Sequence, residues 1–279
     1  MSPETPPGAP AVTPTASQRN RLLAALPAEA QAAIRPHLTR VHLGTGAVLY
    51  RPAAPVTHVY FPETSVASVI NVLAGDGHPD DPAVEVGTVG CEGLVGLGVF
   101  LSGDEGGVAP DANRDDESPR AAHASNVPGV RAVAQVAGDA WCMPADVFAA
   151  HAGALGPLQR LLLRYTQAYL AQVTQTAACN AAHQLEARAA RWLLTTRDRT
   201  DSDRLPLTHT FLAAMLGVRE TGVAIALAAL QAGGVIDATP HAVVIVDRPG
   251  LERAACACYG AVRAEHTRLL GSTGRRDAG

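Results

Sequence analysis

Five cysteines are the side chains of this sequence best able to bind a metal ion: Cys91, Cys142, Cys179, Cys256 and Cys258. Thiolates are frequent zinc ligands, and the last two cysteines form a C-x-C pair. That pair lies in residues 250–270, which have a helical pattern, and side chains two positions apart on a helix point about 200° apart. We therefore expect buried structural cysteines rather than ligands. No Cys/His set in the sequence has zinc spacing, so no metal site is predicted.

Motifs of catalytic sites are missing from the sequence. It has no G-x-S-x-G nucleophile elbow, no phosphate-binding G-K-[ST] loop and no H-E-x-x-H zinc motif. We therefore do not expect an enzyme, and we look next for residues that could bind a partner or a ligand.

Residues 207–236 have the pattern of two short helices joined by a tight turn. Thr208 is a good N-cap for the first helix, and Gly217 stands at the corner. The second helix has an inward apolar stripe formed by Val223, Leu227 and Leu230. An ordinary helical hairpin has this spacing, and so does a helix-turn-helix, whose second helix enters the DNA major groove.

Two short strands follow, at residues 235–238 and 242–246, and they predict a hairpin. A hairpin directly after the second helix favours a winged helix-turn-helix. With LEARAARWLLTTRDR before it and VVIVDRPGLERAACACY after it, this region resembles the C-terminal half of the Crp/Fnr transcription regulators, the family of the cyclic-AMP receptor protein. The similarity runs from about residue 22 to residue 268. It implies a β-roll sensor, a dimerisation helix and a winged helix-turn-helix.

The resemblance also implies which residues contact DNA. Glu220 and Ile225 occupy positions where arginines commonly read guanine, so Arg219 is the positive charge left on that face. The expected base-reading face comprises Thr208, Arg219, Glu220, Thr221, Ala224 and Ile225, and Arg188 and Arg191 are expected to reach the phosphate backbone. We expect Glu220 to stabilise the start of its helix rather than to read cytosine. The alternative is a ligand- or protein-binding module that keeps the fold but has lost sequence-specific DNA binding.

A second set of candidate residues lies in the expected sensor. In relatives that bind a cyclic nucleotide, a Gly-Glu turn holds the ribose, and an Arg-Ser/Thr-Ala segment holds the phosphate. Glu92 and Gly93 resemble the turn, and Arg131 is the nearest arginine to the second piece, which lacks a hydroxyl here. A buried phosphate without its arginine would be uncompensated. We therefore predict a sensor that does not respond to cyclic AMP and no cofactor, and leave another small-molecule effector open.

The pattern upstream predicts the β-roll. Between residues 41 and 148, short apolar segments recur at roughly 8–12-residue spacing, which is typical of an antiparallel jelly roll. A helical lead-in at residues 19–37 breaks at Pro27. The predicted fold is α+β, with these parts: a β-roll at 19–152, a dimerisation helix at 153–183, a winged helix-turn-helix at 184–250, and a C-terminal helix and tail at 251–279.

Two segments are predicted to be disordered. Residues 1–18 are rich in Pro, Thr and Ala, and residues 102–128 form an acidic, Gly- and Pro-containing insertion in a hairpin loop. The carboxylates of the insertion lack the alternating register of a calcium loop.

Residues 155–183 predict one long helix between the two halves. Its stripe has the 4-3 spacing of a coiled-coil seam and comprises Leu158, Leu162, Tyr165, Tyr169, Gln172 and Thr176. A core helix inside one domain would have the same stripe. The length of the helix and its position between differently patterned halves favour a homodimer, with Leu158, Leu162, Tyr165 and Tyr169 in the seam.

Charge is distributed unevenly along the chain. Residues 1–150 hold 8 arginines against 16 acidic residues, and residues 151–279 hold 14 against 10. A basic C-terminal half suits a nucleic-acid binder. No apolar run approaches 18 residues and the N-terminus has no secretory pattern, so we expect a cytoplasmic protein with free cysteines. The expected partners are double-stranded DNA, a second copy of the chain and RNA polymerase, with no membrane.

Overall fold

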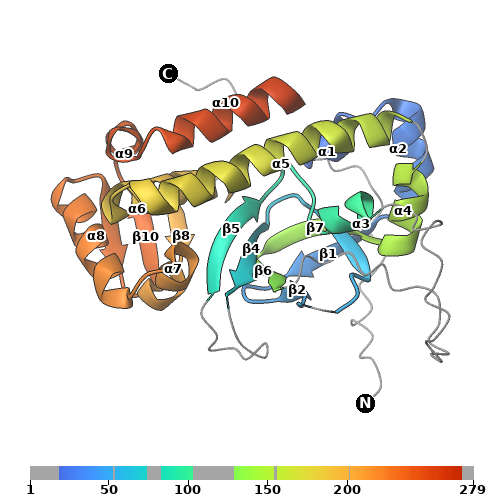
Figure 1. The fold of residues 1–279 in the computed structure, drawn as a ribbon. Helices are drawn as coiled ribbons and strands as arrows, with labels where there is room; N and C mark the ends of the chain where they lie inside the picture. The colour runs from blue at the N-terminus through green and yellow to red at the C-terminus, as the bar shows by residue number, and fades with distance from the viewer. Residues whose placement is uncertain are drawn as a thin grey trace, which may run out of the picture.

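Short strands fold the first half of the chain into two antiparallel sheets (Figure 1). The computed structural model describes residues 19–52, 54–73, 83–102, 129–153, 156–200 and 202–271. The strands of this half are β1 (Thr39–Leu43), β2 (Val48–Tyr50), β3 (His58–Pro62), β4 (Val66–Val72), β5 (Ala83–Val89), β6 (Val130–Val136) and β7 (Gly138–Pro144). One sheet has the order β1-β7-β3 and the other β2-β6-β4-β5. The predicted β-roll is thereby confirmed.

Small helices close the end of the β-roll where the chain enters it. They are α1 (Arg21–Ala24), α2 (Ala28–Ile34), the 3-10 helix η1 (Arg35–His37), α3 (Leu97–Leu101) and α4 (Ala145–Gly153). Pro27 is the N-cap of α2, as its fixed φ and missing N–H favour. Leu22, Leu23 and Ile34 are buried in one cluster with Phe61 and Phe148 from the β-roll and α4.

A long helix, α5 (Pro157–Ala182), runs across the β-roll and is followed after a two-residue break by α6 (Leu185–Thr200) (Figure 1). The predicted dimer seam on α5 is wrong in its placement. Leu158, Leu162 and Tyr165 are buried in the hydrophobic cluster of their own β-roll, and Tyr169 packs against it. A stripe on one face of a helix shows that the face is covered, but not by which chain. The opposite face exposes Leu163 and Leu170.

The second half of the chain is a winged helix-turn-helix. After α6 come β8 (Arg204–Pro206), α7 (His209–Leu216), α8 (Glu220–Ala232), β9 (Ile236–Thr239) and β10 (Ala242–Ile245). The strands form an antiparallel sheet in the order β8-β10-β9. Helix α6 extends to Thr200, and β8 pairs with β10. The core of this half also includes Ile70 from β4, so the two halves pack together.

The last segment is two helices rather than the single helix predicted for residues 250–270. Asp247 caps α9 (Arg248–Ala254) by accepting from the N–H of Gly250. The chain is extended at Ala255, and α10 (Cys258–Leu270) then turns back along α5 (Figure 1).

Several predictions fall outside the described residues: the tail at 1–18, the acidic insertion beyond Ser102, and the end of the C-terminal tail. In the described part, no single helix is both long and apolar enough to cross a membrane, and α7 with α8 passes that test only as a pair bent by 104°.

Candidate nucleic-acid interface and sensor site

The helix-turn-helix has the geometry that its sequence predicted. Helices α7 and α8 meet at 104°, within the range of about 90–120° for this motif. Thr208 caps α7 by accepting from the N–H of Phe211 at 3.1 Å. Gly217 turns the corner with a φ of +64°, which glycine adopts without strain. The stripe of Val223, Leu227 and Leu230 is buried, so α8 presents its other face to solvent.

That outward face carries the residues expected to read DNA. Arg219, Glu220, Thr221 and Ile225 are exposed, and Ile225 keeps 72% of its surface accessible. Ala224 is partly covered. Glu220 is the first residue of α8, and its carboxylate accepts a hydrogen bond from the hydroxyl of Thr210 on α7 at 3.0 Å. Glu220 therefore joins the two helices of the motif as well as facing outward.

A groove of about 500 Å³ separates α8 from the wing. It is lined by His209, Ala224, Leu227, Ala228, Gln231, Ala232, Ala238, Thr239 and Pro240. Gln231 spans it at one end by accepting from the N–H of Ala238 in β9, which ties α8 to the wing. These groups carry no fixed charge, so attraction to phosphate must come from other residues.

Arg188 and Arg191 do not lie on this surface, and the prediction that they reach the DNA backbone is wrong. Both are buried on the inner face of α6. Arg188 donates to the carbonyl of Leu216 at the end of α7, and Arg191 lies close enough to Glu85 to favour its ionised form. Both arginines therefore face the interior, where they cannot contact a phosphate backbone.

Glu92, expected to meet a ligand, instead forms an ion pair with the winged domain. The guanidinium of Arg199 on α6 lies 2.7 Å from Glu92 Oε1, and both side chains are buried. Burial raises the pKa of Glu92, but attraction to Arg199 outweighs it and lowers the pKa to about 2. Arg199 also donates to the hydroxyl of Thr88 and to the side-chain oxygen of Gln172. The carboxylate is thus already satisfied.

Gly93 and Arg131, the other expected ligand residues, do not form a nucleotide site with Glu92. A Cβ atom at Gly93 would overlap with the ring of Tyr165, which donates to the carbonyl of Leu94 at 3.2 Å. Arg131 lies on β6, paired with Ile70 of β4. No described residue partners the buried Nε of Arg131. Glu92 and Gly93 both hydrogen-bond to Gly90, but no hydrogen bond between described residues joins Arg131 to either of them.

A polar network missed by the sequence analysis joins the β-roll to α6. Glu85 on β5 accepts from the hydroxyl of Ser68 at 2.6 Å and from the indole N–H of Trp192 at 3.0 Å. Gln135 Oε1 on β6 lies 2.8 Å from the same hydroxyl, whose single proton can be donated either to Glu85 or to Gln135, and the Gln135 amide donates to Thr196 on α6. The cavity beside this network holds about 20 Å³, room for one water molecule but not a nucleotide. The polar residues Ser68 and Glu85, each inside an otherwise apolar strand, were the available signal.

The cysteine prediction rested on one continuous helix, and the structure removes that premise. Cys256 lies in the link between α9 and α10, while Cys258 begins α10. Cys179, in the last turn of α5, and His183, the extended residue that directly follows this helix, approach them from the end of α5. These four residues form the candidate metal-binding group of the described chain.

Comparison with known proteins gives one match in sequence. Residues 187–254 match the model of the Crp-like helix-turn-helix domain. No curated protein matches the chain.

Solved structures match most of the chain in fold. A protein of Eubacterium rectale described as a Crp/Fnr-family transcriptional regulator has a TM-score of 0.58 at 14% identity, covering 84% of this chain and 96% of that one. FixK2 from Bradyrhizobium japonicum has a TM-score of 0.57 at 16% identity, covering 79% and 98%. A Crp/Fnr-family regulator from Thermus thermophilus has a TM-score of 0.56 at 18% identity, covering 78% and 98%. These similarities confirm the predicted α+β fold.

Proposed function

We propose that this chain, which has the fold of Crp/Fnr regulators and a Crp-like helix-turn-helix domain, is a DNA-binding transcription regulator that acts as a homodimer in the cytoplasm. The observation that carries the proposal is the placement of α8. The helix buries its apolar stripe, exposes its first turn and Ile225, and has the wing beside it. This is the arrangement in which a recognition helix lies in the major groove.

The exposed residues suggest how α8 reads a base sequence. Arg219 can donate two hydrogen bonds to the edge of a guanine, which is the commonest specific contact. Ile225 offers an apolar surface to the methyl group of a thymine. Thr221 can bond to a base or a phosphate. One arginine and one large apolar side chain favour a site that combines a guanine with nearby A·T pairs.

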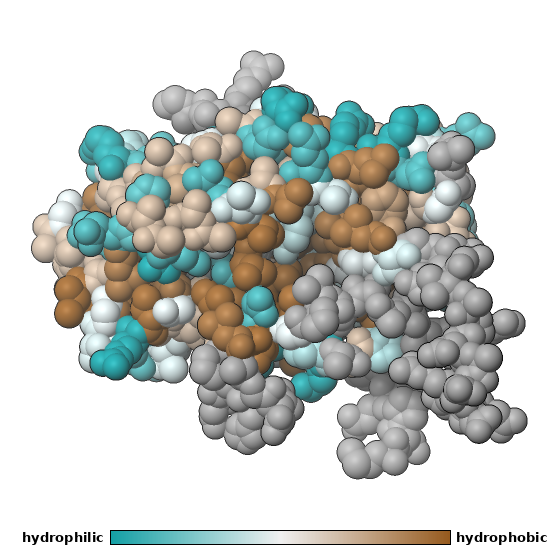
Figure 2. Space-filling model, viewed as in Figure 1, coloured by the Kyte–Doolittle hydropathy of each residue, from teal (hydrophilic) through white to brown (hydrophobic). Residues whose placement is uncertain are grey.

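A homodimer would use the outer face of α5. Leu163 and Leu170 are seven residues apart, which places them on one stripe of the helix, and both are more than half exposed. In Figure 2, which has the same view as Figure 1, hydrophobic residues (brown) lie at the surface along the course of α5. Two copies meeting through this stripe would present two α8 helices to half-sites about 34–36 Å apart. We therefore expect a two-fold symmetric operator.

The β-roll of such a regulator would work without a cyclic nucleotide. Arg199 already forms an ion pair with the carboxylate of Glu92, and the ring of Tyr165 fills the space beside Gly93. An effector that binds near Glu92 would have to displace Arg199 of α6. Any signal reaching this site would therefore act directly on the first helix of the winged domain.

The test is DNA selection followed by titration with salt. The tagged full-length chain is used to capture fragments of genomic DNA, and the affinity for the best fragment is compared with that for a scrambled fragment. We expect the specific complex to be at least about 10³-fold tighter, with a steep fall in log K against log salt. Arg219→Ala should lose affinity for the selected fragment by about tenfold or more.

Arg253→Ala is the matched control, because Arg253 is an exposed arginine on α9, outside the recognition helix. It should bind the selected fragment as the unmodified chain does. Equal affinity for selected and scrambled fragments, with a shallow salt slope, would favour the module that has lost sequence-specific binding.

A further inference from the structure

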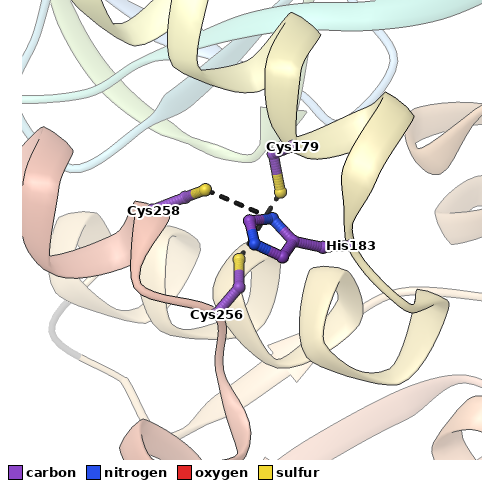
Figure 3. Close-up of side chains that lie close together, drawn as sticks. All are labelled: Cys179, His183, Cys256 and Cys258. Atoms are coloured by element: carbon purple, nitrogen blue, oxygen red, sulfur yellow. Dashed lines mark hydrogen bonds between the residues drawn. The ribbon is translucent and has the colours of Figure 1, made fainter.

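Four side chains that can bind metal converge where α5 ends. Cys179 comes from the last turn of α5, His183 directly follows that helix, Cys256 lies in the link between α9 and α10, and Cys258 begins α10. Their donor atoms all lie within 4.8 Å of one another, and Figure 3 shows the side chains pointing toward a common centre. The three cysteines are buried, and His183 is exposed.

Two of the six separations between donor atoms are close to the edges of a tetrahedral zinc site. Zinc holds sulfur at about 2.3 Å and imidazole nitrogen at about 2.0–2.1 Å, so tetrahedral angles put two sulfurs about 3.8 Å apart and a sulfur and a nitrogen about 3.5 Å apart. In the structure, Sγ of Cys179 and Sγ of Cys256 are 3.5 Å apart. Sγ of Cys258 lies 3.4 Å from Nδ1 of His183. A disulfide requires about 2.05 Å, and these cysteines are free.

The surroundings suit a site of negative charge. Three thiolates, a neutral histidine and Zn²⁺ sum to one negative charge. Arg188 is buried beside the group and interacts electrostatically with Cys179 and Cys256. Its Nε has no hydrogen-bond partner in the described part of the chain. Gln175 donates from Nε2 to Cys258 Sγ at 2.9 Å, as residues that surround a metal site do to its ligands.

We propose that Cys179, His183, Cys256 and Cys258 bind one Zn²⁺ ion in a closed tetrahedral Cys₃His site. Sulfur and imidazole donors select zinc over calcium or magnesium, and four protein ligands leave no open position for a substrate. The donor atoms converge on a single centre, whereas an iron–sulfur cluster would spread its ligands around several metal atoms. The ion is structural rather than catalytic.

A zinc ion at this site would link α10 and the segment before it to the junction between α5 and α6. His183 and Gln184 are the two residues between α5 and α6, where the β-roll half meets the winged half. The N–H of Cys256 also donates to the carbonyl of Ala187 on α6. The ion would therefore hold α10 along α5 and fix the angle between α5 and α6. Its loss should loosen α10 without unfolding the β-roll, whose hydrophobic cluster contains none of the four ligands.

The first test is the metal content of the full-length chain after reconstitution with zinc and removal of the excess. We expect elemental mass spectrometry to find about one zinc ion per chain. Cys256→Ser and Cys258→Ser should lose it, whereas Cys142→Ser should retain it, because Cys142 lies on β7 away from the group. A chain that retains no zinc, or retains iron with sulfide instead, would overturn the proposal.

The second test does not depend on the cysteine variants remaining folded. His183 is exposed, so His183→Ala should fold as the unmodified chain does. Competition with a chromophoric chelator should show zinc affinity reduced by about tenfold or more, because one ligand is gone. Co²⁺ in the unmodified chain should give the absorption of tetrahedral thiolate coordination. Unchanged affinity in His183→Ala, or octahedral cobalt spectra, would exclude the Cys₃His site. None of these readouts requires DNA, so their failure is separate from that of the proposed function.

Discussion

Arg199 on α6 and Glu92 on the turn after β5 form a buried ion pair with a nitrogen–oxygen distance of 2.7 Å. Both residues are 7–9% exposed, and they lie 107 positions apart in the chain. The pair therefore joins the β-roll to the first helix of the winged half at the very carboxylate that the sequence suggested for a ligand. Gln172 of α5 also accepts from Arg199, so three elements meet at this guanidinium.

The first prediction concerns the energy of this pair. Glu92→Gln or Arg199→Met leaves the other member without its partner, so each should lower the free energy of unfolding by about 3–5 kcal/mol. The double variant should lose less than the sum of the two, because no unpaired charge remains. Urea denaturation gives the free energy of unfolding of the unmodified chain, the two single variants and the double variant. Strict additivity would mean that the two residues do not interact.

Glu85 gives a second prediction, on pH. Burial raises its pKa to about 7, although Ser68, Arg191, Arg199 and Trp192 favour the ionised form. A carboxyl whose pKa is raised on folding contributes stability that is fully present below its unfolded value and is lost as pH rises through 7. Glu85→Gln should therefore flatten the fall in stability between pH 5 and 8, a fall of about 3 kcal/mol.

The control is Glu186→Gln on α6, because Glu186 is an exposed glutamate. Denaturant midpoints at pH 5 and pH 8 should differ as much in this control as in the unmodified chain. If Glu85→Gln keeps the same difference as well, Glu85 does not titrate in this range.

Local patterns were enough to predict most of the fold. The buried stripe of α8 and the break at Pro27 depend on neighbours in sequence, and both are where they were predicted. The side of α5 that the β-roll covers could not be predicted in this way. Its stripe from Leu158 to Tyr169 is equally apolar whether the cover is the β-roll or another copy.

The candidate sites depended on contacts that sequence does not encode locally. Arg188 and Arg191 were expected at the surface because charged side chains are seldom buried, yet both are buried, Arg188 against the end of α7 and Arg191 near Glu85 of β5. No proline or glycine at Ala255 indicates that the helix breaks there. The break places Cys256 on the same side as Cys258, whereas a continuous helix would place them on opposite sides. The i, i+4 spacing of Cys179 and His183 was the signal that went unused.

A third prediction places the dimer on the outer face of α5. Leu170→Arg adds a charge to the exposed stripe that contains Leu163, so it should give a folded monomer by sedimentation with unchanged helical content. Leu101→Arg, at an exposed leucine on α3, should remain a dimer. Leu162→Arg should instead unfold the β-roll, since Leu162 is fully buried in its own chain. A dimeric Leu170→Arg protein would contradict this placement.

The last prediction concerns Glu220, whose carboxylate accepts from Thr210 at 3.0 Å. The contact and the position at the first turn of α8 favour a structural role, since acidic residues stabilise helix N-termini by about 0.3–1 kcal/mol. Glu220→Gln keeps an oxygen that can accept from Thr210 but removes the charge. Thermal stability should therefore fall slightly, and DNA affinity should rise on all sequences alike, because a negative charge near phosphates is gone.

Thr210→Val provides the matched comparison, because it removes the hydrogen bond and leaves the charge in place. It should cost stability without raising DNA affinity. A binding profile measured base pair by base pair for both variants separates the two roles of Glu220. If Glu220 reads cytosine, Glu220→Gln will lose its preference at a single C·G pair and gain nothing elsewhere, and the structural role will have to be given up.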